Sequence, residues 1–252
     1  MKKVCILGCG RLSAIVAGAL KDGKVEGVEL AGVCSRTPEK TRALAQKVSC
    51  AAADSLDALL ALKPDYVVEA ATGATVRQCA LPVLAAGADL IVLSTGAFSD
   101  SAFYARVLEA AERYDRHVYL APGVVGGFDI MEAARLMGPV EASFTKRKLP
   151  SASGLGDPAL QALDDHFHGT AAEAYSRFPD HLNVAVSVAL ATCGLDRTRA
   201  AVESGDCVSF TTELSGAFGK ASIYTELGTV GPELAAWSAV AVLRRLNSRI
   251  CF

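Results

Sequence analysis

The sequence predicts an α/β protein in which an N-terminal Rossmann domain, built on a doubly wound parallel sheet, is followed by a second α+β domain. Short apolar runs alternate with segments of helical periodicity throughout the first half of the chain. A glycine-rich turn follows the first of these runs, and the alternation stops after Pro122. Repeated strand–helix units of this length favour a parallel sheet with right-handed crossovers.

In the first half, apolar runs that read as strands are separated by helical segments. Apolar residues at helical spacing follow the glycine turn. Thr37 before Pro38 predicts a helix with Thr37 as its cap and Pro38 as its first residue. Asp54 and Ser55 predict the start of a short helix. The remaining strands and helices are expected at residues 3–7, 27–35, 65–70, 89–94 and 117–122 (strands) and 74–87 and 99–114 (helices).

The second half begins with the glycine-rich segment 123–129 and then mixes strands with helices. Alternation of polar and apolar residues predicts strands, and two of them are joined by the turn "GAFG". Small residues at 151–159 predict a loop. The expected strands are 141–150, 207–215 and 220–227, and the expected helices are 170–178, 182–194 and 232–246.

These patterns predict two domains. Residues 1–122 are expected to form the dinucleotide-binding domain, and residues 123–230 an α+β domain. The C-terminal helix within 231–252 is expected to return to the first domain.

Composition excludes several classes of function. The 252 residues are 51% hydrophobic, with a formal net charge of −2, so the chain can form real cores but offers no positive surface for nucleic acid or an anionic membrane. The first apolar run is too short to span a bilayer. The glycines that follow it would interrupt the hydrophobic region that a signal peptide requires. The eight cysteines form no CxxC pair, so we expect reduced thiols in the cytoplasm and no metal site.

The segment "GCGRLS" has the form G-x-G-x-x-S, where a dinucleotide-binding turn normally ends in Gly or Ala. Gly8 allows the tight turn, and Gly10 allows the backbone to approach a pyrophosphate. Ser13 occupies the third position, and serine is only slightly larger than alanine. Because the turn follows a strand and opens a helix, we expect Gly8, Gly10, Arg11 and Leu12 to contact a dinucleotide. The alternative is a tight turn that binds no ligand.

The second strand ends without the carboxylate that would bind the ribose hydroxyls of NAD. Instead, Arg36 could stack on adenine and neutralise a 2′-phosphate, while Ser35 and Thr37 donate hydrogen bonds. We therefore expect NADP as the cofactor, with NAD possible. The alternative is that Arg36 is a solvated loop residue.

Several stretches, taken in order, resemble the L-aspartate dehydrogenase family: "VVEAATGATVRQCALPVLAAGADLIVLSTGAFSD", "APGVVGGFD", "TKRKLP", "FHGTAAEAYSRFPDHLNVAVSVALATCGLDRTR" and "GAFG". The patterns FPxxxNVA and GxxGGxD are more specific than the glycine turn. The resemblance implies a Rossmann domain and a homodimer, and it makes the α+β domain at 123–230 the one for substrate binding and dimerisation. It also implies interconversion of aspartate and iminoaspartate, with ammonia and NAD(P)H as the other partners.

The resemblance also implies roles for particular residues. Gly123 and Val125 belong to the turn that would cross under the nicotinamide. Asn183 would lie at the substrate pocket, and Lys148 would bind a substrate carboxylate. The alternatives are a helix-start residue for Asn183 and an exposed strand cation for Lys148. Further cofactor contacts are implied at the carboxyl ends of the fourth and fifth strands, at Ala71, Thr72, Ser94, Thr95 and Gly96.

The sequence departs from the family pattern in the half that handles the amino acid. Counting back from Gly216 places Phe210 where the family has its catalytic histidine. Phenylalanine cannot transfer a proton, and a general acid or base typically contributes about 10²–10⁴-fold. His181 is the first candidate to replace that histidine, because it lies two residues before Asn183. The alternative is a helix-start histidine that bonds to the backbone.

Together these observations predict an NAD(P)-dependent oxidoreductase that moves a hydride between nicotinamide and the α-carbon of a small amino or imino acid. One alternative is a dehydrogenase or imine reductase for a less polar substrate, which Phe210 would suit. Another is a catalytically impaired NADP-binding protein. Neither nucleic acid nor a membrane is expected as a partner.

Overall fold

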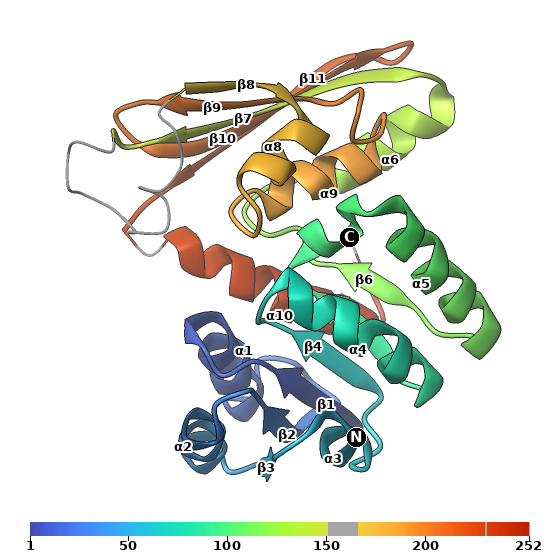
Figure 1. The fold of residues 1–252 in the computed structure, drawn as a ribbon, viewed down its shortest axis with the longest axis vertical. Coiled ribbons are helices and arrows are strands. Elements are labelled where there is room, and N and C mark those ends of the chain that lie inside the picture. Colours follow the sequence, from blue (N-terminus) through green and yellow to red (C-terminus); the bar gives the residue numbers. More distant parts are fainter. Residues whose placement is uncertain (151–165, 230, 252) are drawn as a thin grey trace. The chain divides into compact units, whose positions relative to one another are not determined.

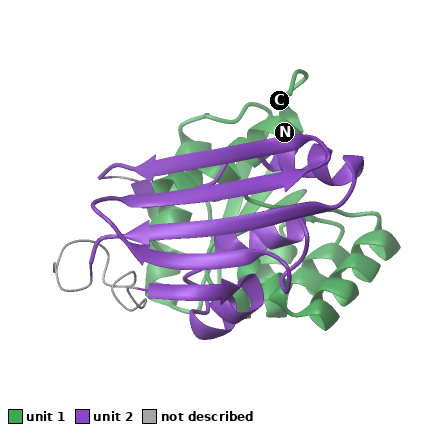
Figure 2. Ribbon diagram, turned by 90° about the horizontal axis from the view of Figure 1, so that it is seen from above, with its two compact units in different colours: residues 1–123, 233–252 green, residues 124–232 purple. Residues whose placement is uncertain are grey.

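The structure is a computed structural model that describes residues 1–150, 166–229 and 231–251. The chain divides into two compact units (Figure 2). Unit 1 comprises Met1–Gly123 and Glu233–Phe252, and unit 2 comprises Val124–Pro232. The loop predicted at 151–159 lies outside the described residues.

Unit 1 is built on a six-stranded sheet in which every neighbouring pair of strands is parallel. The strand order is β3-β2-β1-β4-β5-β6, which reverses between β1 and β4 (Figure 1). Such a reversal is a topological switch point, and ligands bind there, outside the carboxyl ends of the strands. The predicted fold class is confirmed. The strands are β1 (Lys2–Leu7), β2 (Val28–Cys34), β3 (Ala51–Ala53), β4 (Tyr66–Glu69), β5 (Asp89–Val92) and β6 (Val118–Leu120).

Side chains cap three helices of unit 1. The Ser55 hydroxyl accepts a hydrogen bond from the Ala58 amide at the start of α3, the Thr72 hydroxyl accepts one at the start of α4, and the Asp100 carboxylate accepts two at the start of α5. The terminal helix α10 packs against α1 within this unit. The bounds are α1 (Arg11–Lys21), α2 (Pro38–Val48), α3 (Leu56–Leu60), α4 (Gly73–Ala85), a 3₁₀ helix (Thr95–Ser99), α5 (Ser101–Tyr114) and α10 (Leu234–Asn247). A second 3₁₀ helix (Gly231–Glu233) begins in unit 2 and ends at the first residue of the C-terminal part of unit 1.

The start of α2 differs from the prediction. Thr37 is the N-cap residue and Pro38 the first helical residue, as predicted, but the Thr37 side chain makes no capping hydrogen bond. The Thr37 carbonyl instead accepts bonds from the Thr41 amide at 3.1 Å and the Ser35 hydroxyl at 3.1 Å. The Ser35 hydroxyl also accepts the Thr37 amide at 3.3 Å. The helix start is therefore held from the end of β2.

Unit 2 contains a five-stranded sheet of order β11-β10-β7-β9-β8, with helices on one side of it (Figure 1). Strands β7 and β9 are parallel and the other neighbours are antiparallel. The elements are α6 (Phe128–Met137), β7 (Val140–Lys148), β8 (His166–Thr170), α8 (Ala171–Arg177), α9 (Asn183–Ala191), β9 (Arg199–Ser204), β10 (Val208–Gly216) and β11 (Gly219–Leu227).

Three elements of unit 2 were not expected from the sequence. Helix α6 follows Gly127, whose φ of 74° is one that glycine adopts easily and whose lack of a side chain leaves no capping signal. Strands β8 and β9 are short and carry few large apolar residues. Their pairing with each other and with β7 stabilises them, and a pattern confined to one strand does not reveal such pairing.

Candidate active site

The glycine turn joins β1 to α1 at the switch point. Gly8 has a φ of 118° and lies so close to the Ala70 carbonyl that a side chain at Gly8 would collide with it. A Cβ at Gly10 would enter open space, which is the space that a pyrophosphate needs in this motif. Gly10 is also the N-cap of α1 and supplies no capping side chain. The helix therefore begins with amide groups that can bind an anion.

Ser13 fits the third position of the turn and adds a bond there. Its side chain is fully buried, with 0% exposure, and its hydroxyl donates to the Ala70 carbonyl at 2.9 Å. Ala70 directly follows β4, so this bond ties α1 to the turn after the neighbouring strand. The serine thus preserves the close packing of helix and strand that glycine or alanine provides in this motif.

A cavity of about 420 Å³ lies beside this turn, at the carboxyl ends of β1, β2 and β4. Its size is within the range of small-ligand sites. Sequence reasoning did not name Cys9, Lys40, Thr75 or Gln78, which also line it. The predicted cofactor residues that line it are Gly8, Gly10, Ser35, Arg36, Thr37, Ala71 and Thr72.

The end of β2 presents two cations to the cavity. Arg36 and Lys40 are both exposed and come from the loop after β2 and the first turn of α2. Ser35 shares a 2.8 Å hydrogen bond with Thr41, which fixes the loop against the helix. Asp54, at the end of β3, supplies a carboxylate to the same cavity. The chemistry at this end suits a phosphate bound by a guanidinium and an ammonium group.

Other predicted cofactor residues lie away from the lining of this cavity. Arg11 forms an ion pair with Glu233 at 2.9 Å, and Leu12 packs against the core of unit 1. The Gly123 amide donates to the Ser238 hydroxyl of α10 at 3.0 Å. The rest are Val125, buried in unit 2, and Ser94, Thr95 and Gly96, which follow β5 in unit 1.

Two buried lysines mark the helix-covered face of the unit 2 sheet. Lys148 is 1% exposed and Lys146 is 3% exposed. The alternative interpretation of Lys148 as an exposed strand cation is therefore wrong. The two side chains share a face of β7 because residues two apart in a strand point the same way. Sequence reasoning missed Lys146, although the alternating pattern of "TKRKLP" places it on the same face as Lys148.

Phe210 lies directly opposite Lys146 in the β10–β7 pairing. The Phe210 side chain is 7% exposed, and its ring centroid lies 6.1 Å from that of Phe144. The Lys146 ammonium lies 5.9 Å from the Phe210 ring centroid. The position where the resemblance predicts a histidine therefore holds an aromatic ring with a cation beside it.

The turn before α9 reaches the same place through its backbone. The Lys146 ammonium donates to the His181 carbonyl at 3.3 Å. His181 and Asn183 are both half-buried, and Asn183 begins α9 while its amide donates to the Asp180 carbonyl at 3.1 Å. The structure thus brings Lys146, Phe210 and the His181 backbone together.

Two segments of the chain match families of known proteins. Residues 8–121 match the family described as the NAD-binding domain of homoserine dehydrogenase, and residues 129–246 match the C-terminal domain of aspartate dehydrogenase. L-aspartate dehydrogenase 2 of Bordetella pertussis is 35% identical, covering 79% of this chain and 77% of the relative. The chain belongs to the L-aspartate dehydrogenase family. The L-aspartate dehydrogenase of Methanosarcina mazei is 30% identical over 98% of this chain and 97% of that relative.

The fold of this L-aspartate dehydrogenase family member matches a solved structure along its whole length. The crystal structure of aspartate dehydrogenase from Thermotoga maritima superposes with a TM-score of 0.76 at 21% identity, covering 100% of this chain and 99% of that one. The chain is an NAD(P)-dependent oxidoreductase that resembles aspartate dehydrogenase. In the described part of the chain, no helix is long and apolar enough to cross a membrane. The same residues contain no cluster of His, Cys, Asp or Glu able to hold a metal ion.

Proposed function

We propose that the chain is a dehydrogenase that moves a hydride between nicotinamide and the α-carbon of an amino or imino acid. The cavity beside the glycine turn carries this proposal, because Gly10 leaves room for a pyrophosphate at the start of α1. When bound, the nicotinamide supplies or accepts the hydride. In the reductive direction the α-carbon of the imine gains the hydride and its nitrogen gains a proton, which gives the amine.

We propose NADP as the preferred form of the cofactor. Arg36 and Lys40 line the cavity where β2 ends, and β2 itself ends without a carboxylate for the ribose hydroxyls of NAD. A guanidinium binds the oxygens of a 2′-phosphate in a bidentate manner, and an ammonium adds a second positive charge. Asp54 also lines the cavity, and a carboxylate that faced the ribose would favour NAD over NADP.

The substrate is proposed to bind along the helix-covered face of unit 2. Lys148 would pair with a substrate carboxylate, and Asn183 would donate to or accept from the substrate. His181 is the proposed proton-handling group, since an imidazole nitrogen can either donate or accept a proton. The Phe210–Phe144 pair favours a second candidate, a substrate with a less polar side chain, because an aromatic wall cannot satisfy a polar group.

The two candidates are separated by incubating the protein with NADPH, ammonia and a series of 2-oxo acids. Loss of reduced-nicotinamide absorbance with oxaloacetate supports the aspartate-type reaction. Faster loss with an apolar 2-oxo acid supports the second candidate. Binding of NADPH without turnover on any of these acids would make the chain an impaired NADP-binding protein. No binding of either NADH or NADPH would overturn the proposal.

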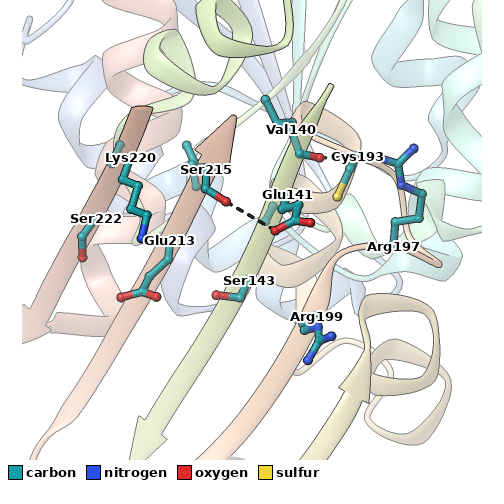
Figure 3. A pocket seen from close by; sticks show the side chains of 13 residues that line it. Val140, Glu141, Ser143, Cys193, Arg197, Arg199, Glu213, Ser215, Lys220 and Ser222 are labelled. Carbon is teal, nitrogen blue, oxygen red and sulfur yellow. Dashed lines mark hydrogen bonds between the residues drawn. The ribbon is translucent and has the colours of Figure 1, made fainter. Parts of the chain in front are cut away.

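We propose a homodimer formed through the other face of the unit 2 sheet. This face carries charges of both signs in one groove, which is lined by Glu141 and Glu213 and by Arg197, Arg199 and Lys220 (Figure 3). A second copy related by a two-fold axis can match acidic groups with basic ones on the same surface. Light scattering should give the mass of a dimer, and Glu213→Arg should shift the mass towards the monomer. A monomeric wild-type chain would contradict this.

We also propose a cytoplasmic location. All eight cysteines are free, and Cys5, Cys34 and Cys79 are buried. Free thiols in these numbers are typical of a reducing compartment. Titration of the denatured protein without reductant should find eight thiols, and fewer would argue for an oxidising one.

A further inference from the structure

Glu69 is the last residue of β4 and is completely buried, with 0% exposure. Its Oε1 atom accepts the Ala71 amide at 2.7 Å and the Ser94 hydroxyl at 2.9 Å. Its Oε2 atom accepts the Ser94 amide at 3.0 Å. Ala71 belongs to the turn after β4 and Ser94 to the turn after β5. One carboxylate therefore fastens the turns of two neighbouring strands.

The surroundings of Glu69 make this carboxylate costly to bury. Burial raises the pKa of Glu69, while donors from Ser94 and Ala71 oppose the rise by binding the ionised form. Cys79 of α4 lies near enough for the Glu69 charge to add to the effect of burial on its thiol, whose pKa rises to about 12. The three donors satisfy the carboxylate, and a neutral side chain could not accept from all three.

The bonded network continues to the glycine turn. Ser13 of α1 donates to the Ala70 carbonyl, and Ala70 lies between Glu69 and Ala71. Hydrogen bonds of the Ser13 hydroxyl and the Glu69 carboxylate thus link α1 with the turns after β4 and β5 near the switch point. Of the residues beyond β4, Ala71 and Thr72 line the cofactor cavity.

We propose that Glu69 is a positioning residue for the nicotinamide half of the cofactor. This rests on the proposed function. In a doubly wound sheet the adenosine half lies against the β1 and β2 ends, and the nicotinamide half lies against the strands on the other side of the switch point. Among the residues that the structure describes, the Glu69 carboxylate bonds to the turns on that second side, after β4 and β5. Its role is to hold their backbone in the shape that receives the nicotinamide.

Glu69→Gln tests the proposal, because a glutamine has one acceptor oxygen and must turn its amino group towards one of the donors. We expect NADPH to bind roughly tenfold more weakly, as for the loss of one bond to a charged group. Binding of adenosine 2′,5′-bisphosphate, which carries only the adenosine half, should change by less than about twofold. General damage to the fold would weaken both ligands together. Fluorescence titration and calorimetry measure the two affinities.

Two further variants keep the test decisive. Ser94→Ala removes only the hydroxyl donor and should weaken NADPH by a smaller factor, even if Glu69→Gln does not fold. Glu109→Gln removes an exposed carboxylate of α5 that pairs with Arg113 and should leave both affinities unchanged. If wild-type protein binds neither ligand, the proposed function itself fails. If wild type binds both and the Glu69 and Ser94 variants bind NADPH as tightly, or lose both ligands equally, Glu69 has no positioning role.

Discussion

The glycine turn of unit 1 and the β7–β10 face of unit 2 both depart from the family pattern, with different consequences. At the turn, Ser13 replaces a smaller residue, is fully buried and bonds to the Ala70 carbonyl. On the sheet face, Phe210 stands where the resemblance to the family predicts a histidine, and its ring packs on Phe144. A phosphate site made of backbone amides tolerates a change in one side chain. Proton transfer depends on one side chain and does not.

The largest effect is expected from Gly8→Ala, which attacks the backbone geometry of the turn. Gly8 has a φ of 118°, and a Cβ there would strike the Ala70 carbonyl. We expect NADPH binding and all turnover to be lost. Gly18→Ala is the matched control, since a Cβ at that α1 position meets no atom and should stabilise the helix by about 0.5–1 kcal/mol. Unchanged NADPH affinity in Gly8→Ala would show that the turn does not hold the cofactor.

Phe210→His tests the other side of the comparison. If the missing histidine limits the aspartate-type reaction, its return should raise kcat with oxaloacetate and ammonia by roughly 10²-fold, towards the range for a general acid or base. NADPH affinity should not change. Phe144→Leu is the control, because it disturbs the same aromatic pair without adding an ionisable group. An equal rise in both variants would point to loosened packing rather than proton transfer.

Arg36→Ala should change the choice of cofactor. Removing a guanidinium from a 2′-phosphate costs about 1.5–3 kcal/mol, so NADPH affinity should fall roughly tenfold or more while NADH affinity stays nearly constant. Lys40→Ala should have a smaller effect in the same direction. The ratio of the two dissociation constants is the measurement. An unchanged ratio would mean that Arg36 does not bind the 2′-phosphate and is a solvated loop residue.

The smallest effect is expected from Ser13→Ala. The variant loses the bond to the Ala70 carbonyl, which is worth about 1 kcal/mol in stability. For a chain of this size we expect the Tm to fall by about 2–4 °C, with cofactor affinity nearly unchanged, since alanine is accepted at this position of the motif. A loss of NADPH binding as large as that of Gly8→Ala would mean that the hydroxyl touches the cofactor.

The same contrast explains what the sequence could reveal. The turn at Gly8 and Gly10 and the strand-end residues Ala71 and Thr72 follow local patterns, and the structure brings them into one cavity. Lys40 was missed because it lies inside a helix, away from any motif. Glu69 was missed because a single carboxylate in a buried apolar strand has no signature until its partner turns are known.

Unit 2 was harder to predict because its elements depend on distant partners. Strands β8 and β9 are stabilised by pairing with each other and with β7, across long stretches of sequence. The meeting of Lys146 with Phe210 is set by the β10–β7 register, which hydrophobic alternation within a single strand does not specify. Lys148 pairs with Ser204 of β9, and a pattern within one strand did not reveal that its side chain is buried.

The central claim is that the cofactor half serves hydride transfer to an α-carbon. The direct measurement uses NADPH with deuterium at both C4 positions, with ammonia and the 2-oxo acid that is consumed fastest, and mass spectrometry of the amino acid formed. The account predicts one deuterium on the α-carbon of the product. NADPH that binds tightly but transfers no deuterium to any amino acid would contradict it.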